Sequence, residues 1–280
     1  MIALLYFVGL GLSSKDISLK ALDVLKRADR IYVDNYTSLF VNSDFKVVLS
    51  EYVDQAKVSF VDREFLEGED YRRILKEAAL RDIVIAVIGD PFIATTHIFI
   101  RIEAEKAGIP TKVIHAPSIL SAGISATGLQ AYKFGKSATI VFPEEEFFST
   151  YPYEVLYDNL LRGLHTFFFL DIKVERSRLM RVEDALKLLL RMEEFENKGI
   201  IDLGALGIGL GRIGSDNEVI RAGSFKDLLQ YNFGPPPHSL IIPGDLHPLE
   251  EEVLIYICGA PKTVVKHWSS RVKKLRSKST

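Results

Sequence analysis

The residues best suited to chemistry lie in one short stretch of the N-terminal half, residues 84–97. Within eight positions it carries a dense group of polar side chains: Asp90, Thr95, Thr96 and His97. Such groups beside a buried strand can hydrogen-bond a small polar ligand. In open parallel sheets, ligands bind at the carboxyl ends of the strands, which is where this stretch is expected to lie.

A plainer interpretation of the same stretch is structural. The five apolar residues Val84–Ile88 predict a buried strand, and Gly89 allows a tight turn after it. Asp90 followed by Pro91 is a common helix start, with the aspartate as N-cap and the proline at the first helical position. Asp90 is therefore expected to cap a helix, to bind a ligand, or to do both.

A similar strand, turn and helix are predicted at the N-terminus. Leu4–Val8 is apolar, Gly9 and Gly11 follow it, and the apolar residues of 17–28 have helical spacing. The dinucleotide-binding fingerprint would need a third glycine at position 14, where Ser14 stands. The glycine pair lets a ligand approach the backbone closely, but it is only a weak indication of a nucleotide cofactor.

Strands and helices alternate through the first half of the chain, which is typical of a parallel, doubly wound α/β sheet. A helix is predicted over Asp70–Leu80. The other strands predicted in this half are Ile31–Val33, Lys46–Leu49, Ile83–Ile88 and Thr111–Ile114.

The second half has a different pattern and is predicted to hold a mixed sheet. It opens with a helix rich in small residues, Ile119–Leu129, and contains an amphipathic helix, Val182–Phe195. The predicted strands are Ala138–Phe142, Thr166–Ile172, Leu203–Leu210 and Ser239–Ile242. We therefore expect two α/β domains, residues 1–115 and 116–265, followed by a basic tail, residues 266–280, that is frayed and solvated.

Composition narrows the class of protein. Of the 280 residues, 48% are hydrophobic and 26% charged, as in ordinary soluble proteins, and the net charge of -2 gives no overall attraction to nucleic acid. Met1–Leu12 lacks a leading basic residue and is too short to span a membrane, so we expect a cytoplasmic protein. The single cysteine, Cys258, excludes an internal disulfide and is expected to be a buried apolar side chain.

Several common catalytic motifs are missing from the sequence. There is no HExxH, CxxC, P-loop or GxSxG pattern, and the histidines show no spacing typical of metal ligands. We therefore predict no metal site. The remaining features are strand ends bearing Gly, Asp, Ser and His, which suit the binding of a small polar cofactor.

Taken together, the motifs resemble the diphthine synthase family, in the tetrapyrrole methylase-like superfamily. The turn Gly89–Pro91 is shared by the wider superfamily, and three other motifs are more specific: Ala94–His97, His115–Ser118 and Tyr132–Thr139. Residues 163–166 and 236–238 also agree. The resemblance runs from the first strand to about Pro261, nearly the whole chain.

This resemblance implies an S-adenosyl-L-methionine-dependent methyltransferase with the cofactor in the cleft between its two α/β domains. Its protein substrate would be translation elongation factor 2, at a histidine that already carries a 3-amino-3-carboxypropyl group. Repeated methylation of the amino group would give diphthine, an intermediate of diphthamide biosynthesis. The resemblance also implies a homodimer, and it requires neither nucleic acid nor a membrane.

The resemblance further implies a set of cofactor-binding residues: Leu12, Asp90, Ile93, Ser118, Ile119, Leu170, Gly211 and His238. It names no catalytic residue. Solvent could take the proton of the amine, and Asp90, Asp171 and His97 are conceivable acceptors. Two positions depart from the family pattern, because Gly211 replaces a common alanine and Phe92 a smaller aliphatic residue.

Two other functions stay open on the residues alone. Within the same fold, a corrin or porphyrin methyltransferase would need a trough for a flat macrocycle. The glycine pair instead suggests a dinucleotide binder, either an oxidoreductase or a protein without catalytic activity. For that function, Asp34 is the only candidate for the acidic residue that contacts the ribose.

Overall fold

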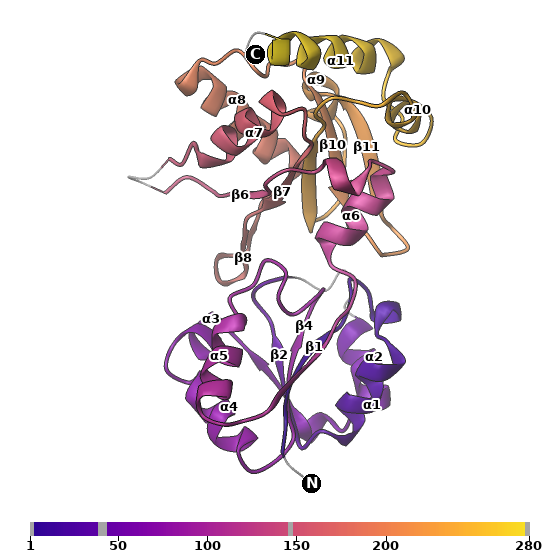
Figure 1. The fold of residues 1–280 in the computed structure, drawn as a ribbon. Helices are drawn as coiled ribbons and strands as arrows, with labels where there is room; N and C mark the ends of the chain where they lie inside the picture. The colour runs from indigo at the N-terminus through magenta and orange to yellow at the C-terminus, as the bar shows by residue number, and fades with distance from the viewer. Residues whose placement is uncertain (1–2, 39–43, 145–147, 278–280) are drawn as a thin grey trace. The chain divides into compact units, whose positions relative to one another are not determined.

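The computed structural model describes residues 3–38, 44–144 and 148–277 of the chain. The chain forms two compact units, residues 1–119 and 120–280, each built around a sheet of its own (Figure 1). No helix within the described ranges is long and apolar enough to cross a membrane.

The first unit contains a five-stranded sheet in which every pair of neighbours is parallel, with the order β3-β2-β4-β1-β5. This confirms the predicted parallel, doubly wound sheet. The strands are β1 (Leu5–Gly9), β2 (Arg30–Asp34), β3 (Val58–Val61), β4 (Ile83–Val87) and β5 (Thr111–Ile114).

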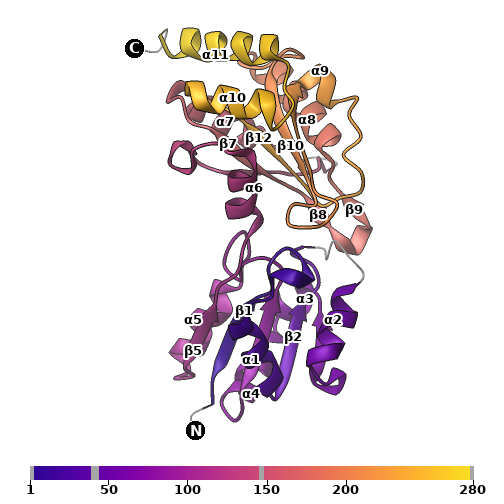
Figure 2. The ribbon, with the colours of Figure 1, turned by 90° about the vertical axis from the view of Figure 1, so that its right-hand side faces the viewer.

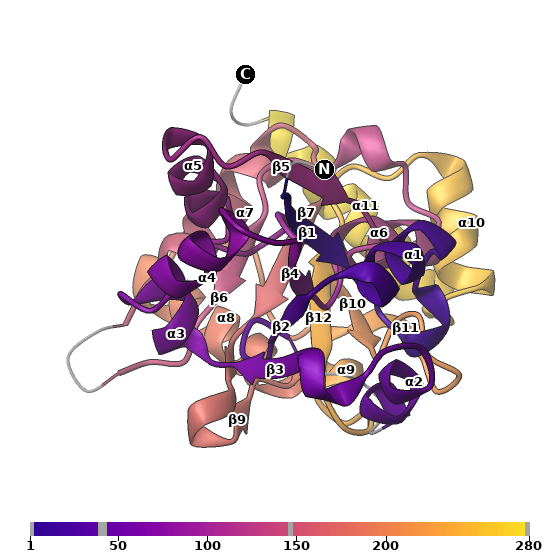
Figure 3. The same ribbon diagram turned by 90° about the horizontal axis from the view of Figure 1, so that it is seen from below.

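Helices cover both faces of this sheet, with α1 and α2 on one side and α3, α4 and α5 on the other (Figure 3). Successive residues of β1 alternate between the two cores, because side chains of a strand point to opposite faces. Leu5 and Phe7 pack in the core shared with α4 and α5, whereas Tyr6 and Val8 pack in the core shared with α1. The helices are α1 (Leu19–Arg27), α2 (Asp44–Tyr52), α3 (Arg63–Glu67), α4 (Tyr71–Ala78) and α5 (Ile98–Lys106).

One predicted strand of this unit is wrong. Lys46–Leu49 lies in helix α2, and the edge strand is β3, further along the chain. The short apolar run did not distinguish a strand from a helix. Leu49 in the helix and Val53 just after its end are both buried at a spacing of four residues, whereas Val47 is exposed.

The second unit contains a mixed sheet, as predicted, and its strands have the order β11-β10-β12-β7-β6. Its β6–β7 pair is parallel and its other pairs are antiparallel. The strands are β6 (Ala138–Ile140), β7 (Thr166–Leu170), β10 (Leu206–Gly211), β11 (Val219–Ser224) and β12 (His238–Ile242), with a separate hairpin of β8 (Ile172–Lys173) and β9 (Arg178–Leu179). Strand β11 and the hairpin were not predicted, and Asp171 separates β7 from β8.

The helices of the second unit are α6 (Ile119–Thr127), α7 (Tyr151–Leu161), α8 (Val182–Glu196), α9 (Phe225–Leu228), α10 (Pro248–Tyr256) and α11 (Lys262–Ser277). Figure 2 shows α10 and α11 lying against each other. Cys258, just after α10, is 1% exposed, and burial raises the pKa of its thiol to about 11. This confirms that Cys258 is a buried apolar side chain and not a nucleophile.

The expectation of a frayed, solvated C-terminal tail is wrong, because the segment forms most of helix α11. Its sequence places Val265, Trp268 and Val272 on one face, and all three are buried. The indole of Trp268 is fully buried and donates a hydrogen bond to the carbonyl oxygen of Pro243 at 2.8 Å. The basic residues occupy the other side of the helix. The number of charges alone therefore did not indicate the apolar face, which depends on the spacing of the residues.

This packing makes the tail a part of the folded unit. We expect Trp268→Ala to lower the free energy of unfolding by about 3–5 kcal/mol, the usual cost of truncating a buried aromatic side chain. Urea unfolding measures the loss, and His267→Ala is the matched control because His267 is exposed on the same helix. Equal stability of the two variants would show that the side chain of Trp268 does not stabilise the core of the second unit.

Candidate functional site

The topology of the first sheet marks one place for a ligand. From β1 the chain crosses to β2 on one side of the sheet, whereas from β4 it crosses to β5 on the other side. The neighbouring strands β1 and β4 therefore form the topological switch point. In open α/β sheets, ligands bind at the carboxyl ends of the strands at this point.

The loops that follow these strands touch each other through their backbones. Gly89 N–H donates to the carbonyl oxygen of Gly11 at 2.7 Å, and Gly11 N–H donates in return to Gly89 at 3.4 Å. A Cβ atom at Gly9 would lie 2.7 Å from the carbonyl oxygen of Gly89 and 2.8 Å from the Cβ of Ala116. The loops after β1, β4 and β5 therefore meet here, and they lie so close that only glycine fits at position 9. They carry four of the predicted cofactor-binding residues, Leu12, Asp90, Ile93 and Ser118, and a fifth, Ile119, directly follows as the first residue of α6.

Asp90 is not a helix N-cap, and that prediction is wrong. Helix α5 begins at Ile98, because Ala94 has a left-handed backbone conformation (φ 57°) that interrupts any helix started at Pro91. The Oδ1 atom of Asp90 instead accepts the N–H of Phe92 at 3.1 Å. Its Oδ2 atom contacts His115 Nδ1 at 2.8 Å and accepts the N–H of Ala116 at 3.4 Å. Asp90 therefore ties the loop after β4 to the loop after β5.

Asp34, the acidic candidate for a dinucleotide ribose, is fully occupied inside the protein. Its Oδ1 atom accepts the N–H groups of Tyr36 and Thr37 at 2.9 and 3.1 Å. Its Oδ2 atom accepts the Thr37 hydroxyl and lies 2.9 Å from His97 Nε2. Burial alone would raise the pKa of Asp34, but these hydrogen bonds lower it overall. An ionised carboxylate with about four acceptor sites has none left for a ribose, which argues against the dinucleotide binder.

The three predicted residues of the second unit are neighbours at one edge of its sheet. His238 at the start of β12 pairs with Gly211 at the end of β10. Ser239 pairs with Phe169, which places His238 beside Leu170 at the end of β7. Three separate strands therefore bring Leu170, His238 and Gly211 into one row.

His238 is buried as a neutral side chain. Burial lowers the pKa of its imidazole to about 4, and the positive charges of Arg212 and Arg181 contribute. Its Nδ1 atom accepts the N–H of Val182 at 3.4 Å, so Nε2 carries the proton and has no hydrogen-bond partner among the described residues. The departure at Gly211 has a steric reason here, since a Cβ would lie 3.1 Å from the carbonyl oxygen of Phe233.

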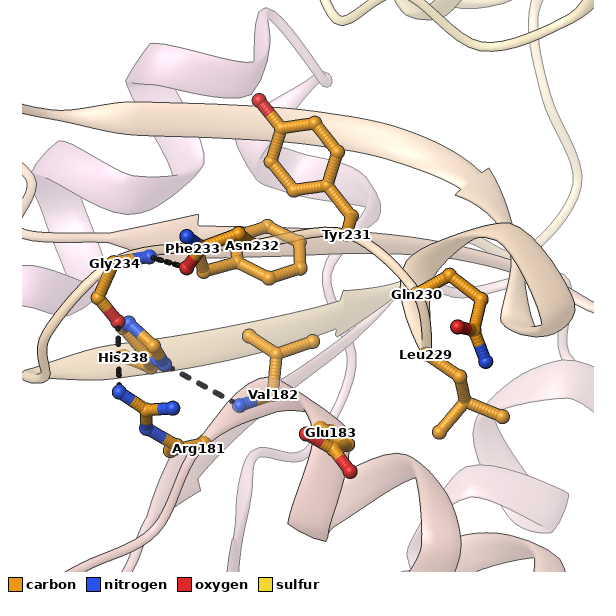
Figure 4. A pocket seen from close by; sticks show the side chains of 10 residues that line it. All are labelled: Arg181, Val182, Glu183, Leu229, Gln230, Tyr231, Asn232, Phe233, Gly234 and His238. Carbon is orange, nitrogen blue, oxygen red and sulfur yellow. Dashed lines mark hydrogen bonds between the residues drawn. The ribbon is translucent and has the colours of Figure 1, made fainter.

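His238 also lines a hollow of about 380 Å³, within the size range of small-ligand sites (Figure 4). The start of α8 and the loop 229–234 form its walls, and Arg181 donates a hydrogen bond to the carbonyl oxygen of Gly234 at 3.3 Å. Leu170 and Gly211 do not line this hollow. The neutral imidazole of His238 thus belongs both to the row with Leu170 and Gly211 and to the lining of this hollow.

Two of the motifs that carry the resemblance each contribute a side chain to a buried cluster within the second unit. Lys133 and His165 both bind the buried carboxylate of Glu250, with His165 Nε2 at 3.0 Å from Glu250 Oε1. Burial alone would raise the pKa of Glu250, but hydrogen bonds from His165, Lys133 and backbone N–H groups hold it well below its usual range. This cluster ties residues 130–133 and the start of β7 to helix α10.

The candidate proton acceptors already have partners in the structure. Asp171 Oδ2 accepts the N–H of Phe142 at 3.1 Å, and His97 contacts Asp34. Within the described ranges, no group of three or more His, Cys, Asp or Glu side chains could hold a metal ion. The absence of a metal from the reaction stays a prediction.

Sequence reasoning also missed or misjudged some contacts of the first unit. The ring of Phe92, one of the two departures from the family pattern, packs against Phe7 with 5.1 Å between the centroids, a contact that the sequence did not indicate. The pairs His97–Asp34 and His115–Asp90 were not predicted. The only signal for them was the position of each carboxylate at a strand end, since the partners lie 63 and 25 residues apart.

Comparison with known proteins gives a consistent result. Residues 4–198 match the model of the tetrapyrrole (corrin/porphyrin) methylases. A diphthine synthase from Staphylothermus marinus is 43% identical over 267 residues, which cover 95% of this chain and 98% of that protein. A diphthine synthase from Methanocaldococcus jannaschii is 42% identical and covers 91% of this chain and 99% of its own length.

The fold agrees with solved structures as well. A crystal structure of diphthine synthase superposes with a TM-score of 0.83 at 33% identity, covering 94% of this chain and 99% of that one. The likeness therefore extends over both units and not only over the switch point of the first sheet.

The state of His238 leads to a prediction about acid stability. Because the folded-state pKa is about 4 and the ordinary value is 6.5, the unfolded chain takes up this proton first as the pH falls. The free energy of unfolding should therefore decrease by about 3 kcal/mol between pH 6.5 and 4 through this group. His238→Asn keeps an acceptor for Val182 N–H and should lose this part of the pH dependence in urea unfolding. The same pH dependence in both proteins would contradict a buried, neutral His238.

Proposed function

The chain belongs to the tetrapyrrole methylase family and, within it, to the diphthine synthases, and from this membership we propose how its site is used. It is a methyltransferase of diphthamide biosynthesis. We propose that the methyl donor is S-adenosylmethionine. The observation that carries this proposal is the meeting of three loops at the switch point between β1 and β4.

We propose that the donor contacts both sets of predicted residues. In the first unit these are Leu12, Asp90, Ile93, Ser118 and Ile119. In the second unit they are Leu170, Gly211 and His238. Three features support the assignment: the close backbone approach at Gly9, the position of Asp90 at the strand end, and the row formed by the second set.

Asp90 is suited to holding a polar or cationic group. Its carboxylate can accept about four hydrogen bonds. Two reach Oδ2, from His115 and Ala116, and one reaches Oδ1, from Phe92. One hydrogen-bond acceptor position on Oδ1 is left for S-adenosylmethionine, and the negative charge of Asp90 attracts the positive sulfonium group.

The methyl transfer requires little from the protein beyond positioning the two reactants. When bound, a sulfonium donor supplies a methyl group that is already activated for displacement by an amine. The residues of the chain must hold the amine in line with that methyl group, and positioning of this kind can lower a barrier by about 7–11 kcal/mol. We assign the proton released by the amine to solvent, because the displacement requires no residue of the chain as a base.

We propose that the acceptor is elongation factor 2, at the histidine that carries a 3-amino-3-carboxypropyl group. Repeated transfer to the amino group would end at the trimethylammonium form, diphthine. We also propose that the enzyme works in the cytoplasm, without nucleic acid or a membrane. The homodimer implied by the resemblance stays a prediction that sedimentation velocity of the purified chain can test.

The comparisons favour this function over a corrin or porphyrin methyltransferase. The family model that carries the tetrapyrrole name ends at residue 198. The relatives that are 42–43% identical over more than nine-tenths of the chain are diphthine synthases.

A mass spectrum of elongation factor 2 tests the proposal directly. After incubation with the chain and S-adenosylmethionine, the modified factor should gain successive methyl groups on the modified histidine. Factor that lacks the 3-amino-3-carboxypropyl group is the control and should gain none, since it offers no amine at that residue. An unchanged mass of the modified factor would refute the proposed function.

Asp90 provides a sharper test of the donor site. Asp90→Asn removes the charge and replaces one of the two oxygens by an NH2 group, which then faces either the N–H of Phe92 or the N–H groups of His115 and Ala116. We expect the binding free energy of the methyl donor, measured by calorimetry, to weaken by about 1.5–3 kcal/mol, the scale of a hydrogen bond to a charged group.

The matched control for Asp90 is His115→Ala, because the side chain of His115 is 75% exposed and its loss leaves the carboxylate in place. This variant should bind the donor almost normally, and melting temperatures without donor should show that both variants fold. Unchanged affinity in Asp90→Asn would remove Asp90 from the donor site.

A further inference from the structure

The segment from Asp90 to His97 is held in a conformation that it would not keep by itself. Ala94, in its middle, has a φ of 57°, which costs free energy for any residue with a Cβ. Inside the segment, the Thr95 hydroxyl donates to the carbonyl oxygen of Pro91 at 2.5 Å. Strain of this kind persists only where the surroundings fix both ends of a segment.

The near end of the segment is fixed by Asp90, as described above. The far end is fixed by His97, whose Nε2 atom lies 2.9 Å from Asp34 Oδ2. The two side chains are 1% and 0% exposed, so water does not weaken the contact. Asp34 itself is the last residue of β2, and two backbone N–H groups orient its carboxylate. The far end is therefore anchored to the sheet and not to another loop.

A second, more exposed tie runs in parallel to the first. The Thr96 hydroxyl donates to Glu67 Oε1 at 2.8 Å, and the Tyr36 hydroxyl donates to the same oxygen at 3.1 Å. The ring of Tyr36 also meets that of His97 edge to face, with 6.2 Å between the centroids. The loop after β2 and the segment after β4 are thus joined by both a buried and a surface contact.

The chemistry of His97 shows which of its atoms matters. Its Nδ1 atom is buried and has no hydrogen-bond partner among the described residues. An apolar side chain would fill this space without leaving a buried nitrogen unpaired, and an unpaired buried polar atom is unfavourable. The benefit of histidine here therefore lies in the Nε2 contact with Asp34. A ring that is 1% exposed does not reach a substrate, so His97 is not the proton acceptor.

We propose that His97 is a positioning residue of the methyl donor site: through Asp34 it fixes segment 91–96, and with it Ile93, in the conformation that binds the donor. The donor part of this inference rests on the proposed function, because Ile93 is a donor contact only there. The fixing of the segment rests on the contacts alone. The two parts can therefore be tested separately.

The first measurement is the affinity of the full-length chain for S-adenosylhomocysteine, the demethylated product of the donor, by calorimetry. His97→Leu should weaken binding about tenfold or more, the effect of losing roughly one strong hydrogen bond. His97→Gln should stay within about threefold of the native chain, because its amide N–H can reach Asp34 from the place of Nε2.

The control is a buried histidine pair of the same kind elsewhere in the chain. His165 is fully buried and contacts Glu250 at 3.0 Å in the second unit. His165→Leu should lower the melting temperature to a similar extent but leave the affinity within about threefold of native. A native affinity in His97→Leu, or an equal loss of affinity in His165→Leu, would overturn the proposal, because either result reduces His97 to a general contributor to stability.

The second measurement is hydrogen exchange of the backbone amides of residues 92–96, without any ligand. Exchange should be about tenfold faster in His97→Leu and unchanged in His165→Leu. Where His97→Leu fails to fold, Asp34→Asn replaces it in both measurements. Unchanged exchange overturns the fixing of the segment whether or not the native chain binds the donor. A native chain that binds no donor refutes the proposed function and the donor part, while exchange still decides whether His97 fixes the segment.

Discussion

The first unit depends on how closely β1 and β4 approach each other at their carboxyl ends. Gly9 lies against the carbonyl oxygen of Gly89 and the side chain of Ala116, and no larger residue fits there. This contact brings the loops after β1, β4 and β5 together at the switch point of the sheet. A side chain at position 9 would separate the loops and, with them, the residues proposed to bind the methyl donor.

Two pairs of carboxylate and imidazole then fix the segment after β4. Asp90 ties its start to His115, and His97 ties its end to Asp34. The two pairs differ in environment, because His115 is mostly exposed whereas His97 and Asp34 are buried. A charge-assisted bond gains strength in a water-free interior and is weak at an exposed surface. The buried pair is therefore the firmer of the two anchors.

In the second unit, residues of two motifs typical of the family form a buried ionic cluster. Lys133 and His165 belong to stretches that carry the resemblance, yet both surround Glu250 in the interior. Removing one partner of such a cluster leaves a buried charge unpaired, which is strongly destabilising. By contrast, His238 is buried as a neutral group next to Leu170 and Gly211, and its role is proposed from that row.

The sequence by itself determined the parallel sheet, the mixed sheet, most strand positions and the family, because apolar runs and motifs are local patterns. Only the tertiary structure decided that Lys46–Leu49 is helical, that α5 begins at Ile98, and that the basic tail is a packed helix around Trp268. For the tail, the deciding interaction joins residues far apart in the chain, because the indole of Trp268 bonds to Pro243. His97 and Asp34 are the clearest example, because neither residue type nor spacing indicates a pair that forms only when the ends of β2 and β4 lie at the same edge of a sheet.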